Sequence, residues 1–243
     1  MVTAEFVKHY GSPAAAARAV RHHRWLAGNA PPMRQPRICG TAAASITFEH
    51  ITGQHARTND LRALAGLLGD AHGSAWDVDL RRADLGTPHP LPGGGSLGDY
   101  LACRRVALHR RLERGFLPGT AALRAMLTLL EETATGPAAF YKDSNPRNFL
   151  ITGSGTIFVI DTDDVTLAPL GYDLAKLIVT LQMTYRNLRS AAVTTALDSY
   201  NQAAARHGHL AVTHAHLDPF LALHRVFNAP YAGRHGYLLR PTS

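Results

Sequence analysis

The chain has 243 residues and a formal net charge of +7, and 46% of its residues are hydrophobic while 18% are charged. This composition is typical of a globular protein with a sizeable core. It excludes a disordered chain, and no apolar run approaches the ~20 residues of a membrane span. Nucleic-acid binding is disfavoured, because the basic residues are scattered, aromatic residues make up only 7% of the chain and no binding motif is present.

The N-terminal part predicts two strands and a helix. Its first residues lack the basic start and apolar core of a signal peptide, and two cysteines, Cys39 and Cys103, are too few for a disulfide framework. A cytoplasmic protein is therefore expected. Residues 5–10 predict a strand and residues 45–51 predict another. Residues 13–27 predict the helix between them, because a Ser-Pro pair at its start supplies an N-cap and a first-turn proline.

The middle of the chain predicts three helices and a loop. Leucines at helical spacing predict a helix that starts near residue 58. Residues 81–95 are rich in Pro and Gly and predict a loop. The Ser-x-x-Asp pattern that follows resembles a capping box, which predicts a helix over residues 96–113. Residues 121–132 predict the third helix.

Three polar residues flank short apolar runs in the next segment. Asp143 is followed five residues later by Asn148, and Asp161 stands thirteen residues after that. The apolar runs 149–151 and 157–160 predict two strands joined by a Gly-containing turn. Such a hairpin brings Asn148 and Asp161 to the same end.

These residue types suit phosphoryl transfer. The reaction requires alignment of the nucleophile and cancellation of phosphate charge. Mg²⁺ takes oxygen ligands, usually one or two carboxylates together with substrate phosphates, and Asn148 and Asp161 offer a neutral and a charged oxygen. Taken singly, each of these residues is more often a cap or turn former. Their joint spacing and apolar flanks favour the functional interpretation.

The C-terminal part predicts three helices, over residues 172–188, 190–207 and 213–227. Other kinds of site find less support along the chain. The glycine run at residues 93–95 lacks the lysine of a phosphate-binding loop, and the paired histidines lack partners at the spacing of zinc ligands.

The polar segment resembles the catalytic and metal-binding loops of the aminoglycoside phosphotransferase and choline kinase family, the small-molecule branch of the protein-kinase-like fold. The firmest part of the family pattern, Asp-x-x-Pro-x-Asn, is matched by Asp143, Pro146 and Asn148. An Ile-Asp-Thr-Asp block at residues 160–163 and an Asp-Leu-Ala block at residues 173–175 follow in the family's order.

By that resemblance the chain has an α+β, protein-kinase-like bilobal fold. It implies a reduced, β-containing N-terminal lobe over residues 1–53, with a hinge near residues 48–53. A mainly helical C-terminal lobe, which carries the catalytic loops and the acceptor-binding helices, is expected over residues 54–243.

The resemblance also implies roles for the acidic residues and the asparagine. Asp143 is the catalytic base or the residue that orients the hydroxyl group. Asn148 and Asp161 are the Mg²⁺ ligands, and Asp163 supports the metal or helps to hold a second one. Asp173 braces the catalytic loop from the start of the following helix.

On the nucleotide side, the resemblance matches Lys8 to the lysine that contacts the α- and β-phosphates of ATP. Glu49 lies in the segment that meets adenine through its backbone. Lys142 stands where the family usually has Gly, and it either contacts phosphate or is a solvated side chain. Arg147 replaces a small residue and is placed to reach an acidic group of the substrate.

Two departures from the family pattern keep an alternative open. Only seven residues precede Lys8, so the glycine-rich hairpin is missing, through a late start codon or a reduced lobe, and the next helix has no clear Glu for Lys8. The resemblance predicts an ATP- and Mg²⁺-dependent O-phosphotransferase that acts on a hydroxyl of a small molecule, such as an antibiotic, a sugar or a related alcohol. The alternative is a catalytically impaired, pseudokinase-like nucleotide-binding or scaffold protein.

The charge of the C-terminal part bears on the acceptor, which usually docks there in this family. From residue 165 onward the chain has seven basic and three acidic residues. A polycationic acceptor would need an acidic groove. A neutral or anionic alcohol is therefore expected as the small-molecule partner.

Overall fold

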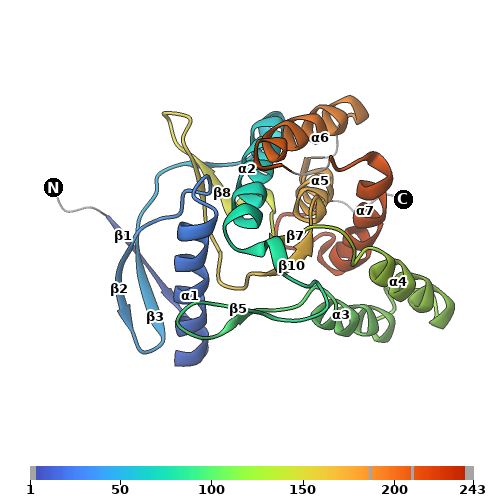
Figure 1. The fold of residues 1–243 in the computed structure, drawn as a ribbon, viewed down its shortest axis with the longest axis horizontal. Coiled ribbons are helices and arrows are strands. Elements are labelled where there is room, and N and C mark those ends of the chain that lie inside the picture. The colour runs from blue at the N-terminus through green and yellow to red at the C-terminus, as the bar shows by residue number, and fades with distance from the viewer. Residues whose placement is uncertain (1–3, 186–187, 209–210, 239–243) are drawn as a thin grey trace.

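The computed structural model describes residues 4–185, 188–208 and 211–238, which form a small lobe rich in strands and a larger helical lobe (Figure 1). The small lobe holds one antiparallel sheet of three strands in the order β1-β3-β2. These strands are β1 (Glu5–His9), β2 (Ile38–Ala42) and β3 (Ser45–Glu49). The strands over residues 5–9 and 45–49 confirm the two predicted at those positions, whereas β2 was not predicted.

Helix α1 (Pro13–Asn29) stands beside this sheet. The Ser12 side chain accepts a hydrogen bond from the Ala15 N–H at 3.2 Å, which confirms the predicted N-cap. The buried face of the helix repeats at helical spacing and consists of Ala16, Ala19, His22, Trp25 and Leu26.

Short strands lie where the two lobes meet. One sheet has the order β4-β8-β9 and contains the predicted hairpin, in which Phe149 pairs with Val159. A second pair, β7 with β10, leads into and out of the catalytic segment. The strands are β4 (Gln54–His55), β7 (Ala138–Tyr141), β8 (Phe149–Ile151), β9 (Ile157–Val159) and β10 (Thr166–Pro169).

The large lobe is built around α5, which is buried without interruption from Tyr172 to Leu181. Its helices are α2 (Leu61–Val78), α3 (Ala102–Glu113), α4 (Thr120–Glu132), α5 (Tyr172–Tyr185), α6 (Ser190–Ala204) and α7 (His214–Asn228). None of the helices in the described part of the chain combines the length and apolar character that a membrane crossing requires.

Helices α2 and α6 pack unusually close together. A Cβ atom added at Gly69 of α2 would overlap the main-chain carbonyl of Tyr200 of α6. Only glycine therefore fits at this crossing, and the contact fixes how α6 lies on the rest of the lobe.

The expected helix start near residue 96 is wrong. Ser96 lies instead in β6 (Ser96–Leu97), which pairs with β5 (His89–Pro90), and α3 begins only at Ala102. Asp99 supplies the cap, because its side chain accepts hydrogen bonds from the N–H groups of Leu101 and Ala102 at 2.8 and 2.6 Å.

Candidate active site

The segment that leads into the β8–β9 hairpin lies between two cavities. The interlobe cavity, of about 490 Å³, is lined by Lys8 and Phe48 of the small lobe and by Asp161 and Asn148 of the hairpin segment. The C-lobe cavity, of about 790 Å³, is lined by residues of α3, α5 and α7 and by Asp143. Asn148 lines both cavities, so the two meet at the catalytic segment.

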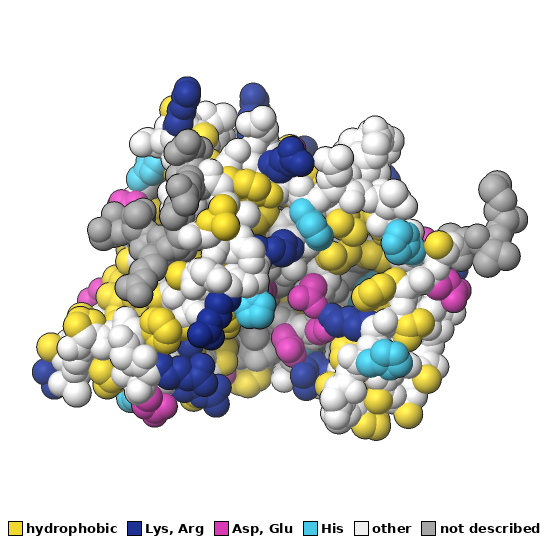
Figure 2. Space-filling model, turned by 180° about the vertical axis from the view of Figure 1, so that it is seen from behind, with side chains coloured by type: hydrophobic (Ala, Val, Ile, Leu, Met, Phe, Trp, Pro, Cys, Tyr) yellow, Lys and Arg dark blue, Asp and Glu magenta, His cyan; other side chains and the backbone are white. Residues whose placement is uncertain are grey.

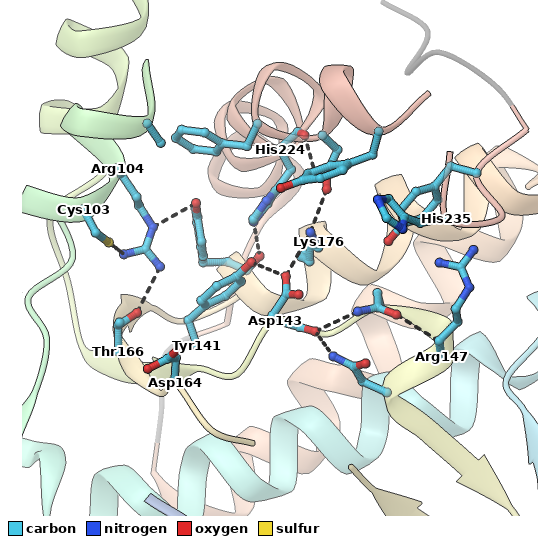
Figure 3. A pocket seen from close by; sticks show the side chains of 18 of the residues that line it. Cys103, Arg104, Tyr141, Asp143, Arg147, Asp164, Thr166, Lys176, His224 and His235 are labelled. Carbon is cyan, nitrogen blue, oxygen red and sulfur yellow. Dashed lines mark hydrogen bonds and ion pairs between the residues drawn. The ribbon is translucent and has the colours of Figure 1, made fainter. Parts of the chain in front are cut away.

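Asp143 lies at the floor of the C-lobe cavity in a left-handed backbone conformation, with φ of +64°. Its carboxylate accepts a hydrogen bond from the Tyr141 hydroxyl at 2.6 Å and forms an ion pair of 2.9 Å with Lys176 Nζ. Figure 3 shows both side chains converging on it. The Asn148 amide donates to the Asp143 carbonyl at 2.8 Å, which ties the loop around Asp143 to the start of the β8–β9 hairpin.

The surroundings of Asp143 keep it ionised. Burial raises the pKa of the Asp143 carboxyl, but Lys176 and the Tyr141 hydroxyl outweigh that effect and hold this pKa at about 2. The side chain is still 47% exposed toward the cavity. A carboxylate of this kind is a weak base that orients a hydroxyl group well.

Asp173 braces the catalytic loop from the first turn of α5. Its fully buried carboxylate accepts hydrogen bonds from the Ser144 N–H and hydroxyl at 2.8 and 2.9 Å, and from the Lys142 N–H at 3.3 Å. Burial raises the pKa of Asp173, and these donors together with the Lys142 charge partly offset the shift. The placement agrees with the role that the resemblance implied.

Lys8 meets two carboxylates in the interlobe cavity. Its Nζ lies 2.5 Å from Asp161 and 2.5 Å from Asp163, and the Tyr10 hydroxyl donates to the other oxygen of Asp163 at 3.0 Å. Burial lowers the pKa of Lys8, but hydrogen bonds to the two carboxylates outweigh it and raise that pKa above its ordinary value. Lys8 is thus a charged group that Asp161 and Asp163 hold at the wall of the interlobe cavity.

The acidic partner that α1 lacks is supplied by Asp163. Helix α1 contains no Asp or Glu, and it contributes other side chains to the same loop. His22 Nδ1 lies 2.7 Å from the Asp163 carbonyl oxygen, and Arg18 donates to Asp164 at 2.8 Å. Helix α1 therefore holds the loop that contains Asp163 and Asp164, and Asp163 in turn holds Lys8.

Asn148 and Asp161 face the interlobe cavity from the same end of the hairpin, as the sequence predicted. The Asn148 carbonyl accepts the Ile160 N–H at 3.0 Å, which keeps the two positions side by side. The Asn148 nitrogen is used by Asp143, which leaves its side-chain oxygen for a cation, and Asp161 is 55% exposed.

This donor set fits Mg²⁺ bound together with phosphates. The described residues contain no group of three or more His, Cys, Asp or Glu that could hold a metal by themselves. One carboxylate and one amide oxygen are the usual protein share of an Mg²⁺ site that is completed by nucleotide phosphates.

The other two predicted nucleotide contacts differ in position. Glu49 lines the interlobe cavity at the end of β3, where its side chain accepts the Arg37 N–H at 2.9 Å. Lys142 lines neither cavity: it is 1% exposed, its Nζ lies 4.4 Å from the Phe149 ring centroid, and it has no hydrogen-bond partner among the described residues. Burial lowers the Lys142 pKa. The expected phosphate contact of Lys142, and its alternative as a solvated side chain, are therefore corrected.

Lys176 is the main site residue that the sequence analysis missed. Its Nζ joins Asp143 to Asn228 of α7, whose side-chain oxygen lies 2.7 Å away. A lysine within the apolar run of α5 is a signal that could have found it, because a buried lysine needs a charged or polar partner.

The chain is similar to a known protein family and to several solved structures. The model of the phosphotransferase enzyme family matches residues 6–218. The choline kinase LicA from Streptococcus pneumoniae is 13% identical, with a TM-score of 0.63 over 95% of this chain and 77% of its own. The macrolide 2'-phosphotransferase MphH from Brachybacterium faecium is 17% identical, with a TM-score of 0.56 over 97% of this chain and 81% of its own.

A third structure is an enzyme with both of its ligands. The aminoglycoside phosphotransferase APH(3'')-Id from Streptomyces rimosus, in complex with ADP and streptomycin, is 14% identical, with a TM-score of 0.58 over 92% of this chain and 86% of its own. A search of curated protein sequences returned no significant match. The structural likenesses show the fold, and the family model shows the family: the chain has the α+β protein-kinase-like fold and belongs to the phosphotransferase enzyme family.

Proposed function

We propose that the protein transfers the γ-phosphoryl group of ATP, with Mg²⁺, to a hydroxyl group of a small molecule bound in the C-lobe cavity. The observation that carries the proposal is the meeting of two cavities at one segment, with Asp143 on one side, Asp161 on the other and Asn148 lining both. Solved structures of this fold in complex with ADP and streptomycin, and with AMP-PNP, Ca²⁺ and Ami, support a nucleotide and a second small molecule as the two ligands.

The interlobe cavity is proposed as the ATP site. Apolar side chains such as Phe48, Ile51 and Leu150 line it and suit an adenine ring, with Glu49 beside them. Lys8 is proposed to neutralise the α- and β-phosphates, since it is charged and faces the same cavity. We place the lobe boundary near residue 53, because β4 already pairs with β8 of the large lobe. Use of ATP fits the expected cytoplasmic location.

Asn148 and Asp161 are proposed to hold Mg²⁺, which when bound supplies positive charge against the β- and γ-phosphates. Lys8 forms ion pairs with both Asp161 and Asp163. Phosphates would draw Lys8 away from Asp161 and free that carboxylate. Asp163 would remain paired with Lys8, so we propose that Asp163 stabilises the metal site and does not bind the metal directly.

Asp143 is proposed to orient the acceptor hydroxyl. The hydroxyl oxygen forms a bond to the γ-phosphorus, the bond from that phosphorus to the β–γ bridging oxygen breaks, and ADP leaves. The hydroxyl proton is released through Asp143. Because its pKa is about 2, Asp143 takes this proton late, and alignment is its larger contribution. A neutral or anionic alcohol fits the basic C-terminal helices better than a polycation.

The alternative of an impaired, pseudokinase-like scaffold gains no support from the site. The missing acid of α1 motivated it, yet Lys8 has acidic partners in Asp161 and Asp163. Asp143 lines the C-lobe cavity, Asp161 lines the interlobe cavity and Asn148 lines both, which supports the enzyme proposal.

The substitution Asp143→Asn tests the proposal. It keeps the shape of the side chain and its tolerance of a left-handed backbone. We expect ADP release in the presence of pooled hydroxyl compounds to fall by about 10²- to 10⁴-fold, while the Kd for Mg·ATP stays the same. Unchanged ADP release in this variant would contradict the role of Asp143.

A further inference from the structure

The C-lobe cavity carries an excess of positive charge. Four basic side chains line it, against two carboxylates, Asp143 and Asp164. Lys176 is paired with Asp143, and Asp164 is engaged by Arg18 of α1. Burial, with Lys176 and Arg104, holds the pKa of His224 well below its ordinary value, so this histidine adds no charge at pH 7. The basic side chains are Arg104, Arg111, Arg147 and Lys176.

Arg104 is a buried cation whose described partners are all neutral. It is 5% exposed and donates to the Tyr172 hydroxyl at 3.0 Å, the Tyr100 carbonyl at 2.7 Å and the Thr166 hydroxyl at 3.3 Å. The rings of Tyr100, Tyr141 and Tyr172 lie within 4.5–5.0 Å of its guanidinium carbon. Neutral dipoles and rings satisfy its N–H groups but leave its charge uncancelled beside the cavity.

Arg111 continues the same wall of α3. It lies seven residues after Arg104, two helical turns on, and thus on the same face. Its Nε and one Nη donate to the Phe227 carbonyl at 3.2 and 2.7 Å. Its guanidinium also forms a hydrogen bond with the Tyr231 side chain. These partners are neutral, so the positive charge of Arg111, like that of Arg104, stays uncancelled beside the cavity.

Arg147 approaches from the opposite wall. Its guanidinium lies 4.6 Å from the Tyr237 ring centroid, and it follows Asp143 by four residues. Figure 3 shows Arg104 and Arg147 on either side of Asp143. Seen from behind, dark blue Lys and Arg side chains lie on several sides of the central hollow, and acidic side chains gather within it (Figure 2). No carboxylate of the described residues forms an ion pair with Arg104, Arg111 or Arg147.

We propose that the acceptor carries an acidic group, a phosphate or a carboxylate, besides the hydroxyl that is phosphorylated. Arg111 and Arg147 bind this group through charge-assisted hydrogen bonds, and the positive charge of Arg104 attracts it without direct contact. An amine-bearing acceptor would meet three uncancelled guanidinium groups and is disfavoured. This inference rests on the proposed function, because it concerns the acceptor of the same reaction.

Four sugars of matched scaffold test the inference: glucose 6-phosphate, glucuronate, glucose and glucosamine. Each is titrated calorimetrically into protein loaded with Mg·AMP-PNP, at constant ionic strength. We expect one or both acidic sugars to bind at least roughly tenfold more tightly than glucose, and glucosamine to bind most weakly. A preference between the two acidic sugars distinguishes a phosphate from a carboxylate.

Matched variants locate the effect. Arg111→Gln and Arg147→Gln are expected to reduce the acidic preference by about tenfold each. Arg110→Gln removes the same charge from an exposed position of α3 that does not line the cavity, and it should leave the preference unchanged. Equal binding of the four sugars, tighter binding of glucosamine, no detectable binding of either acidic sugar, or equal effects of the three variants would overturn the inference.

The same titrations separate this inference from the proposed function. If Mg·AMP-PNP does not bind, the proposed function is contradicted, and the sugars are then titrated into the free protein. If Mg·AMP-PNP binds but the acidic sugars show no preference, the nucleotide site stands and the acidic acceptor is overturned.

Discussion

Asp143 and Asp161 share an uncommon backbone conformation. Their φ angles are +64° and +59°, in the left-handed region that few non-glycine residues adopt and that Asp and Asn tolerate best. Such positions persist where the surroundings hold them. Here the Ser144 N–H donates to Asp173 next to Asp143, and the Ile160 N–H donates to the Asn148 carbonyl next to Asp161. The conformation turns the two carboxylates toward the two cavities.

Lys176 sets the protonation of Asp143, and Lys176→Met tests this. Removing Lys176 takes away the strongest influence that lowers the Asp143 pKa, so that pKa rises from about 2 and protonation begins at a higher pH. We expect the acid limb of the kcat–pH profile to move upward, and kcat at pH 7 to fall by about 10-fold or more. Rates measured in both proteins from about pH 2, where the unaltered Asp143 titrates, up to pH 9 check this. An acid limb at the same pH in both would exclude this role for Lys176.

Two lysines near the catalytic segment are expected to differ. Lys8→Met should raise the Kd for Mg·ATP by about tenfold, because Lys8 is a charged group that faces the interlobe cavity. Lys142→Met should leave this Kd unchanged, because the Lys142 amine is buried against Phe149 and lines neither cavity. Calorimetric titration, with circular dichroism to confirm folding, measures both. A loss of affinity in Lys142→Met alone would reverse the assignment.

At the scale of elements, helices and the catalytic hairpin could be predicted because their signals are local. Helical spacing of leucines, a Ser-Pro start and apolar runs around a glycine turn are all contained within a few residues. Strands β7 and β10 could not be predicted in this way. They are four residues long, lack alternation, and exist because they pair with each other across 24 intervening residues.

The start of α3 shows how two local signals can compete. Ser96 and Asp99 have capping-box spacing, but Ser96 pairs with Pro90 in the β5–β6 hairpin. Asp99 alone then caps the helix, which begins at Ala102. The pairing of β6 with the upstream strand β5 thus prevented Ser96 from capping the helix. The four residues of the capping-box pattern do not reveal this pairing.

The α2–α6 crossing makes a stability prediction. Gly69→Ala should lower the free energy of unfolding by about 1–3 kcal/mol, because the added Cβ would overlap the Tyr200 carbonyl and force the helices apart. Gly28→Ala in α1 is the control, since no atom lies within 4 Å of its added Cβ, and it should be neutral or slightly stabilising. Urea denaturation measures both. Equal stability of the two variants would show that the helices do not depend on this close approach.

At the scale of the whole molecule, the two kinds of site residue differ in how they could be found. Asp143, Asn148 and Asp161 lie within 19 residues of sequence, so their spacing alone indicated one site. Lys176, Asn228 and the α3 arginines reach the C-lobe cavity from helices far apart in the chain. Only the packing of α3, α5 and α7 brings them together. The net charge of the sequence counts such basic residues but does not show that they share one cavity.

The central claim is that the interlobe cavity binds a nucleotide through Mg²⁺, and calorimetric titration of ATP tests it most directly. The titration is made with the full chain, with and without Mg²⁺, alongside Asp161→Ala. The account predicts binding that requires Mg²⁺ in the unaltered protein and is weakened by about tenfold or more in the variant. Binding that is the same without Mg²⁺, the same in Asp161→Ala, or undetectable throughout would contradict it.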